Sequence, residues 1–421
     1  MVEKERSEKG RLRKLSCGKV TFAKTKLYRK AFSMSHFNTS QRLFHLLCAP
    51  LLAFLPQAVI SHNSDCRTHK FTGQHHLLLS IFAQLSGAAS SIALTEELND
   101  LDIPSTQASL RQIIGFDKEE FGQPLTLNQS SLSRANAHRS YRLWKYCFHK
   151  LWQTAKKKCQ PSLLEGLGRV VAVDGTLFDC LPRMSWAVYR STKNKLKGHF
   201  FFNLDGLPER LVLTVGTGNE RDVLHTNFRS GVTYLLDHGY NDYQLFAHMM
   251  KMQAHFVTHL LSNALVDALE DYRVDQTQEL KGVVSDQKVF IGKGEGGVEL
   301  RMVVYRDVSG KDWHYITSRF DIAATSVAEL YLNRWEIETF FGWMKGHLQL
   351  GHWYSENENG VLIQLYAALI TFLLLKIYAA HCTKLEFRAM RLEFIRWVQR
   401  HLADPVSDDQ GLSYTSLLNY T

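Results

Sequence analysis

The segment from Tyr331 to Lys345 constrains the fold of this chain more than any other; it reads Tyr-Leu-Asn-Arg-Trp-Glu-Ile-Glu-Thr-Phe-Phe-Gly-Trp-Met-Lys. These residue types predict a helix that begins near Ser326, where Ser-Val-Ala-Glu is typical of a capping box. At about 100° per residue, Tyr331, Arg334, Glu338 and Lys345 fall on one narrow stripe. Apolar side chains cover most of the remaining surface, so we expect the helix to be largely buried.

The polar stripe on this helix has two explanations. Charged groups on a buried helix are costly unless they meet partners, a metal ion or an anionic ligand, which makes the stripe a candidate functional site. Alternatively, Arg334 and Glu338 form an ordinary i,i+4 ion pair at a solvated edge. Helical geometry alone leaves both explanations open.

The net charge of +9 is concentrated at one end of the chain. Residues 1–33 contain eleven Lys/Arg and three Glu. The remainder is close to neutral, so the overall charge is weak evidence for a nucleic-acid partner. Segment 1–33 is either a basic disordered tail or an extension upstream of a start at Met34. The seven cysteines form no Cys-x-x-Cys pair, which argues against a zinc ribbon and suits a reducing cytosol.

Residues 34–160 are expected to be mainly helical, and one part of them is strongly basic. Residues 131–158 contain eight Lys/Arg and no acid, with aromatic residues interleaved. This basic patch, which includes Arg134, Arg139, Arg142 and Lys145, indicates contact with phosphates. The alternative is a solvated basic face over an aromatic core.

From about residue 168 the pattern changes to short apolar runs typical of strands. We expect a hairpin across Asp205-Gly206 and strands at 169–176, 199–204, 210–215, 233–236 and 255–261. A helix is expected at 241–252, and residues 265–320 are hairpin-like. The later helices are expected at 361–380 and near 386–402. The first of these is long enough to span a bilayer, but its place directly after a buried helix favours a core helix. The order of elements predicts an α/β fold with a mixed sheet and flanking helices.

Two acidic residues lie at the ends of predicted strands. Asp174 and Asp237 are each followed by glycine within two residues. If the strands are neighbours, the two carboxylates converge, and Glu338 completes a triad. Such oxygen donors suit Mg²⁺ or Mn²⁺ rather than zinc, and two ions of this kind serve phosphodiester cleavage. Each of the two aspartates also has a plainer explanation. Asp174 simply ends a strand. Asp237 has a rival in Asp242, which is the better candidate for capping the helix that follows.

The spacing of the stripe carries a family resemblance. Tyr331, Arg334, Glu338 and Lys345 are separated by two, three and six residues. This pattern resembles the signature of the insertion-sequence-four family of DDE transposases. The strand ending Asp174-Gly-Thr resembles the first acidic motif of that family, and Asp237-His-Gly-Tyr resembles the second. The segment 131–136, Ser-Leu-Ser-Arg-Ala-Asn, resembles one that commonly precedes the catalytic domain. The resemblance covers about residues 34–400.

The resemblance implies a domain organisation. It implies an RNase H-like catalytic core, a mixed sheet with flanking helices, formed by residues 166–264 and 321–402. A β-rich insertion would occupy residues 265–320. An all-helical DNA-binding domain would occupy residues 34–165. The basic segment 1–33 and the C-terminal tail 403–421 fall outside it.

The resemblance also implies an activity and a set of site residues. It implies a DNA transposase that cleaves insertion-sequence ends and transfers the strands, in cut-and-paste transposition. Asp174, Asp237 and Glu338 would be catalytic and would bind two Mg²⁺ (or Mn²⁺) ions. Tyr331, Arg334 and Lys345 would contact the element's end. Trp313 is a candidate for holding a flipped base, with an ordinary packed aromatic as the alternative.

The implied partners are double-stranded DNA and a second copy of the chain. The DNA comprises the terminal inverted repeats and the target, and the homodimer would pair two ends. The expected location is the bacterial cytoplasm, at the nucleoid, without a membrane. Two other functions remain open: an RNase H-like nuclease that cuts without strand transfer, and an inactive DNA-binding derivative. The presence of all three acids weighs against the inactive derivative.

Overall fold

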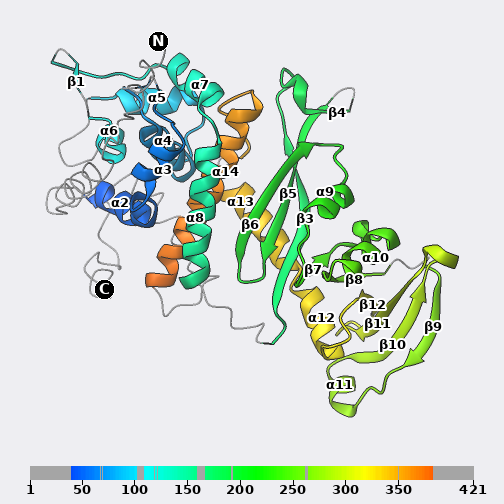
Figure 1. Ribbon diagram of the computed structural model, residues 1–421. Coiled ribbons are helices and arrows are strands. Elements are labelled where there is room, and N and C mark those ends of the chain that lie inside the picture. The colour runs from blue at the N-terminus through cyan, green and yellow to red at the C-terminus, as the bar shows by residue number, and fades with distance from the viewer. Residues whose placement is uncertain are drawn as a thin grey trace, which may run out of the picture.

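The structure, a computed structural model, describes residues 39–66, 68, 70–101, 109–117, 119–120, 122–158, 166–190, 193–260, 264–348 and 350–382. Our predictions for segments 1–33 and 403–421, and for a helix near 386–402, lie outside these residues. The helices of residues 39–158 gather on one side of the molecule, and the strands from residue 169 onward lie on the other (Figure 1). Two long C-terminal helices run between the two parts (Figure 1).

The described part of residues 39–158 is mainly helical, as its apolar periodicity predicts. It also contains one pair of two-residue antiparallel strands (β1, Glu119–Glu120; β2, Gln123–Pro124). Thr72 caps α4 through a capping box, and Asn128 caps α7. The basic segment is two helices rather than one, because the chain leaves the helical conformation at Arg139. The helices are α2 (Thr39–Leu52), α3 (Leu55–Ser61), α4 (Gly73–Ser86), α5 (Ser91–Asn99), α6 (Leu110–Ile114), α7 (Gln129–His138) and α8 (Arg142–Lys158).

The apolar helix α14 (Glu358–Cys382) packs against α2, α4, α7 and α8. In the described part of the chain, its segment Glu358–Tyr378 is long and apolar enough to cross a membrane, and two bent helix pairs also pass that test. However, 89% of the apolar window of α14 is buried inside the protein. Asn359 at its start donates to the carbonyl oxygens of Asn136 and Arg139. These contacts match the core helix that the sequence predicts.

The strands from residue 169 onward form one ten-stranded mixed sheet. Its order is β4-β5-β3-β7-β8-β12-β11-β10-β9, with β6 paired to β5. β3 and β7 are parallel, as are β7 and β8. The predicted hairpin joins β5 to β6, with Gly206 in the left-handed region (φ +79°). The strands are β3 (Arg169–Asp179), β4 (Val188–Arg190), β5 (Lys193–Asn203), β6 (Leu207–Val215), β7 (Val232–Leu236), β8 (His255–His259), β9 (Val266–Asp271), β10 (Val283–Ile291), β11 (Val298–Arg306) and β12 (Asp312–Thr317).

The β-rich segment predicted at 265–320 continues the main sheet. β12 pairs antiparallel with β8, and Ile316 lies opposite Thr258. A short helix, α11 (Gln276–Leu280), connects β9 to β10. The backbone hydrogen bonds therefore run without interruption from β3 through β7 and β8 into the hairpins.

Helices cover both faces of this sheet. On one face lie α10 (Tyr243–Lys251) and α9 (Glu220–Asn227), a helix that our sequence analysis missed. Asp242 caps α10 by accepting from the backbone N–H groups of Gln244 and Leu245, as the sequence predicts. On the other face lie α12 (Ala324–Leu332) and α13 (Trp335–His347).

The prediction of one continuous helix from Ser326 is wrong. The chain forms α12 and α13, and α12 begins after Ala323 without a side-chain cap. At the break the hydrogen bonds tighten, since the N–H of Arg334 donates to the carbonyl of Tyr331. Leu332 and Trp335 are 54% and 63% exposed there, so burial is less complete than the apolar composition indicates. The backbone at Arg334 is still close to helical (φ −54°, ψ −31°), which keeps Arg334 and Glu338 one turn apart.

Aromatic side chains fix α13 between the sheet and α14. The rings of Phe340 and Phe341 lie 5.7 and 5.3 Å from that of Phe200 on β5. On the other side, Phe340 and Trp343 contact Phe372 of α14 at 5.0 and 4.8 Å. Burial of each such ring contributes about 2–3 kcal/mol. This packing fixes the position of α13, and therefore of Glu338, relative to the sheet.

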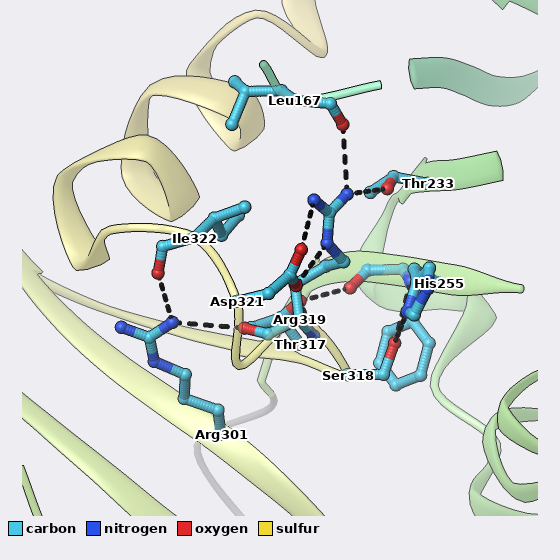
Figure 2. A network of polar contacts seen from close by, with 10 residues as sticks. Leu167, Thr233, His255, Arg301, Thr317, Ser318, Arg319, Asp321 and Ile322 are labelled. Carbon is cyan, nitrogen blue, oxygen red and sulfur yellow. Dashed lines mark hydrogen bonds and ion pairs between the residues drawn. The ribbon is translucent and has the colours of Figure 1, made fainter. Parts of the chain in front are cut away.

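Two buried arginines fix the chain where it enters α12 (Figure 2). Arg319 makes a bidentate pair with Asp321 and donates to Thr233 Oγ1 (2.7 Å) and to the Leu167 carbonyl (3.1 Å). Arg301 pairs with Asp286 through two bonds of 2.8 and 2.7 Å. It also donates to the carbonyl oxygens of Arg319 and Ile322. The segment between β12 and α12 is thus attached to β7, to Leu167 two residues before β3, and to β11.

Arg319→Met should lower the free energy of unfolding by about 2–4 kcal/mol. The substitution leaves the Leu167 carbonyl and the Thr233 hydroxyl without their donor. The matched control is Arg306→Met, which removes a solvent-exposed pair with Asp312 and should leave the free energy of unfolding almost unchanged. Urea unfolding measures both, and equal losses in the two variants would refute the role given to Arg319.

A buried histidine joins α4 to α7. His76 donates through Nε2 to Asn136 Oδ1 (2.8 Å), and its ring lies 4.9 Å from that of Trp144. Burial, together with the charge of Arg139, lowers the pKa of His76 to about 3. The unfolded chain therefore binds a proton at this residue more readily than the folded chain does.

The His76 contribution to stability is complete above about pH 6.5 and decreases as the pH falls towards 3. We expect the native chain to lose about 2 kcal/mol from this residue between pH 6.5 and 5. His76→Gln keeps an amide that can bond Asn136 and does not titrate, so its pH dependence should be shallower by that amount. Urea unfolding at pH 7 and pH 5 tests this, and parallel curves would contradict it.

Candidate active site

The parallel pairing of β3 with β7 brings two of the predicted acids together. The pairing runs from Arg169 opposite Val232 to Val173 opposite Leu236 and stops there. Asp174 and Asp237 are the next residues, at the same edge of the sheet, and their charges interact. The chain turns at His238–Tyr240 immediately after Asp237. β7 ends here, whereas β3 continues to Asp179 beside β5, so Asp174 lies within a strand rather than at its end as the sequence predicts. The carboxyl ends of parallel strands are a common place for a binding site.

Arg334 connects this edge to α13. Its guanidinium lies 2.8 Å from Glu338 Oε1 and 3.9 Å from Asp174 Oδ2, and it also interacts with the charge of Asp237. The three predicted acids therefore surround one guanidinium. The ion pair between Arg334 and Glu338 exists, but the arginine side chain is only 13% exposed, so the pair does not lie on a solvated edge.

The electrostatics of the site follow from its burial. Burial is the main cause that raises the pKa of Asp174 to about 6, and the charges of Glu220 and Asp237 act in the same direction. The N–H of Gly175 (2.7 Å) and the charge of Arg334 oppose the rise. Burial acts to lower the pKa of Arg334, but the surrounding Tyr331 and acids outweigh it, and the pKa is raised. Arg334 is therefore the counter-ion of the acids in this state.

A fourth acid, Glu220 at the start of α9, lies at the same edge. It pairs with Lys197 of β5 (2.6 Å) and interacts with the charge of Asp174. Our sequence analysis missed both residues because it did not recognise α9. The available signal was Asn219 followed by Glu-Arg-Asp, which is typical of a helix N-terminus.

The other two residues of the stripe, Tyr331 and Lys345, lie in different parts of the structure. The ring of Tyr331 packs on that of Tyr315 (4.6 Å), and the Arg334 guanidinium lies 5.6 Å from the ring centroid of Tyr331. Lys345, in contrast, lies 5.6 Å from the ring centroid of Phe178 and interacts with Asp179. Tyr331 is thus beside the acids, and Lys345 is at the far end of β3.

Trp313 is held firmly in the insertion. Its Nε1 donates to Asp307 (2.9 Å), and Lys311 Nζ lies 3.7 Å from its ring centroid. Its ring is 5.3 Å from that of His259, which in turn lies 6.4 Å from Tyr331. An aromatic series therefore links the insertion to the active-site edge.

The predicted basic patch divides in the structure. Arg134, Arg142 and Lys145 are exposed. Arg139 is buried, and its guanidinium donates to the carbonyl oxygens of Ser64, Phe71 and Thr72. Because those bonds use its donors, Arg139 is a structural residue joining α7 to the loop before α4, and we leave it out of the surface proposed to contact DNA.

The donor set at the edge is chemically suited to Mg²⁺ or Mn²⁺, since every acid there offers carboxylate oxygens. In the present arrangement no three His, Cys, Asp or Glu side chains among the described residues are close enough to hold one ion. The guanidinium of Arg334 lies between Asp174 and Glu338 instead.

Comparison with known proteins agrees with this geometry. Residues 165–374 match the family described as the transposase DDE domain. The chain is 29% identical over 263 residues to a putative transposase of Sinorhizobium fredii, covering 61% of this chain and 73% of the relative. It is 26% identical to a probable transposase for insertion sequence element IS5377 of Geobacillus stearothermophilus, covering 52% and 58%. A putative transposase for insertion sequence element IS4SA of Synechocystis is 21% identical, covering 67% and 80%.

The fold and the matched domain define a transposase, an enzyme that acts on DNA. More specifically, the chain belongs to the insertion-sequence transposases of the DDE type, which confirms the resemblance seen in the sequence. Members of this family generally use divalent metal ions.

Arg334→Gln should destabilise the metal-free protein by about 1–3 kcal/mol, because Asp174 and Glu338 lose their counter-ion. Arg183→Gln, which removes an exposed pair with Glu356, is the matched control and should change stability by under about 1 kcal/mol. Both values come from urea unfolding in a metal chelator. An Arg334 variant as stable as the control would contradict the counter-ion role.

Proposed function

We propose that this chain is a cut-and-paste DNA transposase that cleaves insertion-sequence ends and transfers the freed strands to target DNA. Asp174, Asp237 and Glu338 are its catalytic residues. The observation that carries the proposal is the meeting of these acids, from β3, β7 and α13, around Arg334. Three acids from separate elements at one sheet edge suit metal-assisted phosphodiester chemistry.

The cofactor of the proposed reaction is a pair of Mg²⁺ or Mn²⁺ ions held by Asp174, Asp237 and Glu338. When bound, such ions activate the attacking oxygen and stabilise the leaving one. The acids supply the ligands, and the aromatic contacts of α13 keep Glu338 facing the two strand ends. The side chain of Asp174 is partly shielded from solvent, with 22% of it exposed.

Arg334 and Tyr331 are proposed to contact a phosphate of the element's end. In the metal-free state the guanidinium neutralises the acids. A bound DNA backbone offers it an alternative anion, with which an arginine makes strong bidentate bonds. Lys345, farther along β3, is proposed to contact a phosphate away from the cleavage point. Trp313 is proposed to hold a flipped base, and its bond to Asp307 fixes the ring for that role.

The remaining architecture is proposed by analogy with the family. The catalytic part, residues 166–264 and 321–402, is proposed to be an RNase H-like core with an insertion at 265–320. Residues 34–165 are proposed to be a helical DNA-binding domain whose exposed Arg134, Arg142 and Lys145 contact phosphates of double-stranded DNA. We propose that a homodimer pairs the two terminal inverted repeats, in the bacterial cytoplasm at the nucleoid.

The test is incubation of the full chain with Mg²⁺ and DNA carrying the inverted repeats that flank its gene. We expect nicking at the 3′ ends followed by joining to target DNA. Asp174→Ala and Glu338→Ala should each reduce nicking by about a thousandfold or more, because each removes a metal ligand. Glu336→Gln, an exposed change on α13, is the matched control and should keep activity.

Each outcome distinguishes a function. Nicking without joining would identify a nuclease that lacks strand transfer. Absence of both reactions in a folded native protein would identify a DNA-binding derivative. Full activity of Asp174→Ala or Glu338→Ala would refute the assignment of the triad.

A further inference from the structure

Glu220 approaches the catalytic edge from the face of the sheet opposite to α13. It is the first residue of α9, and its Oε1 pairs with Lys197 Nζ at 2.6 Å. Both side chains are mostly shielded from solvent, with exposed fractions of 25% and 19%. This pair therefore differs from the exposed ion pairs elsewhere on the molecule.

Two glycines show how closely Glu220 approaches the acids. A Cβ atom on Gly175, the residue after Asp174, would lie 2.7 Å from Glu220 Oε1 and 2.8 Å from Lys197 Cε. A Cβ atom on Gly239 would lie 3.9 Å from both Glu220 Oε2 and Asp237 Oδ2. The carboxylates of Glu220 and Asp237 are thus separated by no more than twice that distance. The missing side chains at these glycines leave the space in which the carboxylates face each other.

The hydroxyl of Tyr240 is an unpartnered polar group at this position. The tyrosine is fully buried, and its Oη makes no hydrogen bond. The charges that act on it are those of Glu220, Asp174 and Asp237, in decreasing order of effect. A buried hydroxyl without a partner is costly. This hydroxyl is therefore a donor that remains available at the edge where these acids gather.

We propose that Glu220 is a fourth carboxylate of the catalytic metal site, with Lys197 as its counter-ion while metal is absent. The proposal rests on the metal-dependent function proposed above. The two cations have matching positions: Arg334 neutralises acids on one face of the sheet edge, and Lys197 neutralises Glu220 on the other. A divalent ion would replace Lys197 as the partner of Glu220, and Tyr240 could then donate to a carboxylate.

The proposal predicts opposite effects for the two members of the pair. Glu220→Gln removes a negatively charged ligand and should weaken Mn²⁺ binding by about tenfold or more. Lys197→Met removes the competing cation and should strengthen Mn²⁺ binding several-fold. A purely structural ion pair would make the two changes equivalent, with a loss of stability and no change in Mn²⁺ affinity.

The experiment is a Mn²⁺ titration of the full chain without DNA, in which electron paramagnetic resonance measures free Mn²⁺. Asp222→Asn is the matched control, because it removes an exposed acid from the same first turn of α9 and should leave the affinity unchanged. Asp174→Asn tests the triad in the same assay and should abolish tight binding. Thermal unfolding in a chelator shows whether each variant is folded.

The outcomes separate this inference from the proposed function. Native Mn²⁺ affinity in Glu220→Gln, with loss of binding in Asp174→Asn, would overturn the role of Glu220 and leave the triad intact. Native affinity in both variants would overturn the triad as well. If Glu220→Gln does not fold, Lys197→Met decides, since it keeps the carboxylate: unchanged or weaker binding overturns the proposal.

Discussion

The structure depends on how charge is balanced at the sheet edge that carries Asp174 and Asp237. Asp174, Asp237 and Glu338 come from three elements that are distant in the sequence, and like charges at one place repel each other. Arg334 makes this arrangement stable in the metal-free state, because its guanidinium contacts Asp174 and Glu338 and interacts with the charge of Asp237. The acids can therefore be held ready before the ligands arrive. The cost is that Arg334 and the ions proposed to bind there compete for the same oxygens.

Contacts elsewhere in the molecule fix the positions of these residues relative to one another. The rings of Phe340 and Phe341 fix α13 against β5, while Arg319 ties the chain entering α12 to β7. Both sets of contacts position α12 and α13, the segment of the chain that carries Glu338. Thr233 lies on β7, the strand that ends directly before Asp237. The side chain of Arg319 therefore links the chain entering α12 to the strand that positions the second acid. The precision of the site is thus a property of packing beyond the acids themselves.

Much of this could be predicted from the sequence, where local signals and burial agree. The apolar run before Asp174 and the hairpin at Asp205-Gly206 identified strands, and the Asp242 cap was also predicted correctly. The break between α12 and α13 was missed because periodicity does not record a tightened turn. The burial of Arg139 was missed because three carbonyl oxygens, supplied by a distant loop, make it favourable. The approach of Glu220 to the other acids depends on the space that glycines such as Gly175 leave, and composition does not reveal that space.

The pairing of β12 with β8 has a mechanical consequence. A domain attached by linkers can swing about its connections, but a hydrogen-bonded sheet resists rotation between neighbouring strands. Here Ile316 faces Thr258, and β8 lies directly beside β7. The hairpins of residues 266–317 and the edge that carries Asp237 are therefore parts of one continuous hydrogen-bonded sheet. Any group that the outer strands contact is therefore positioned relative to Asp237 by backbone hydrogen bonds rather than by a linker.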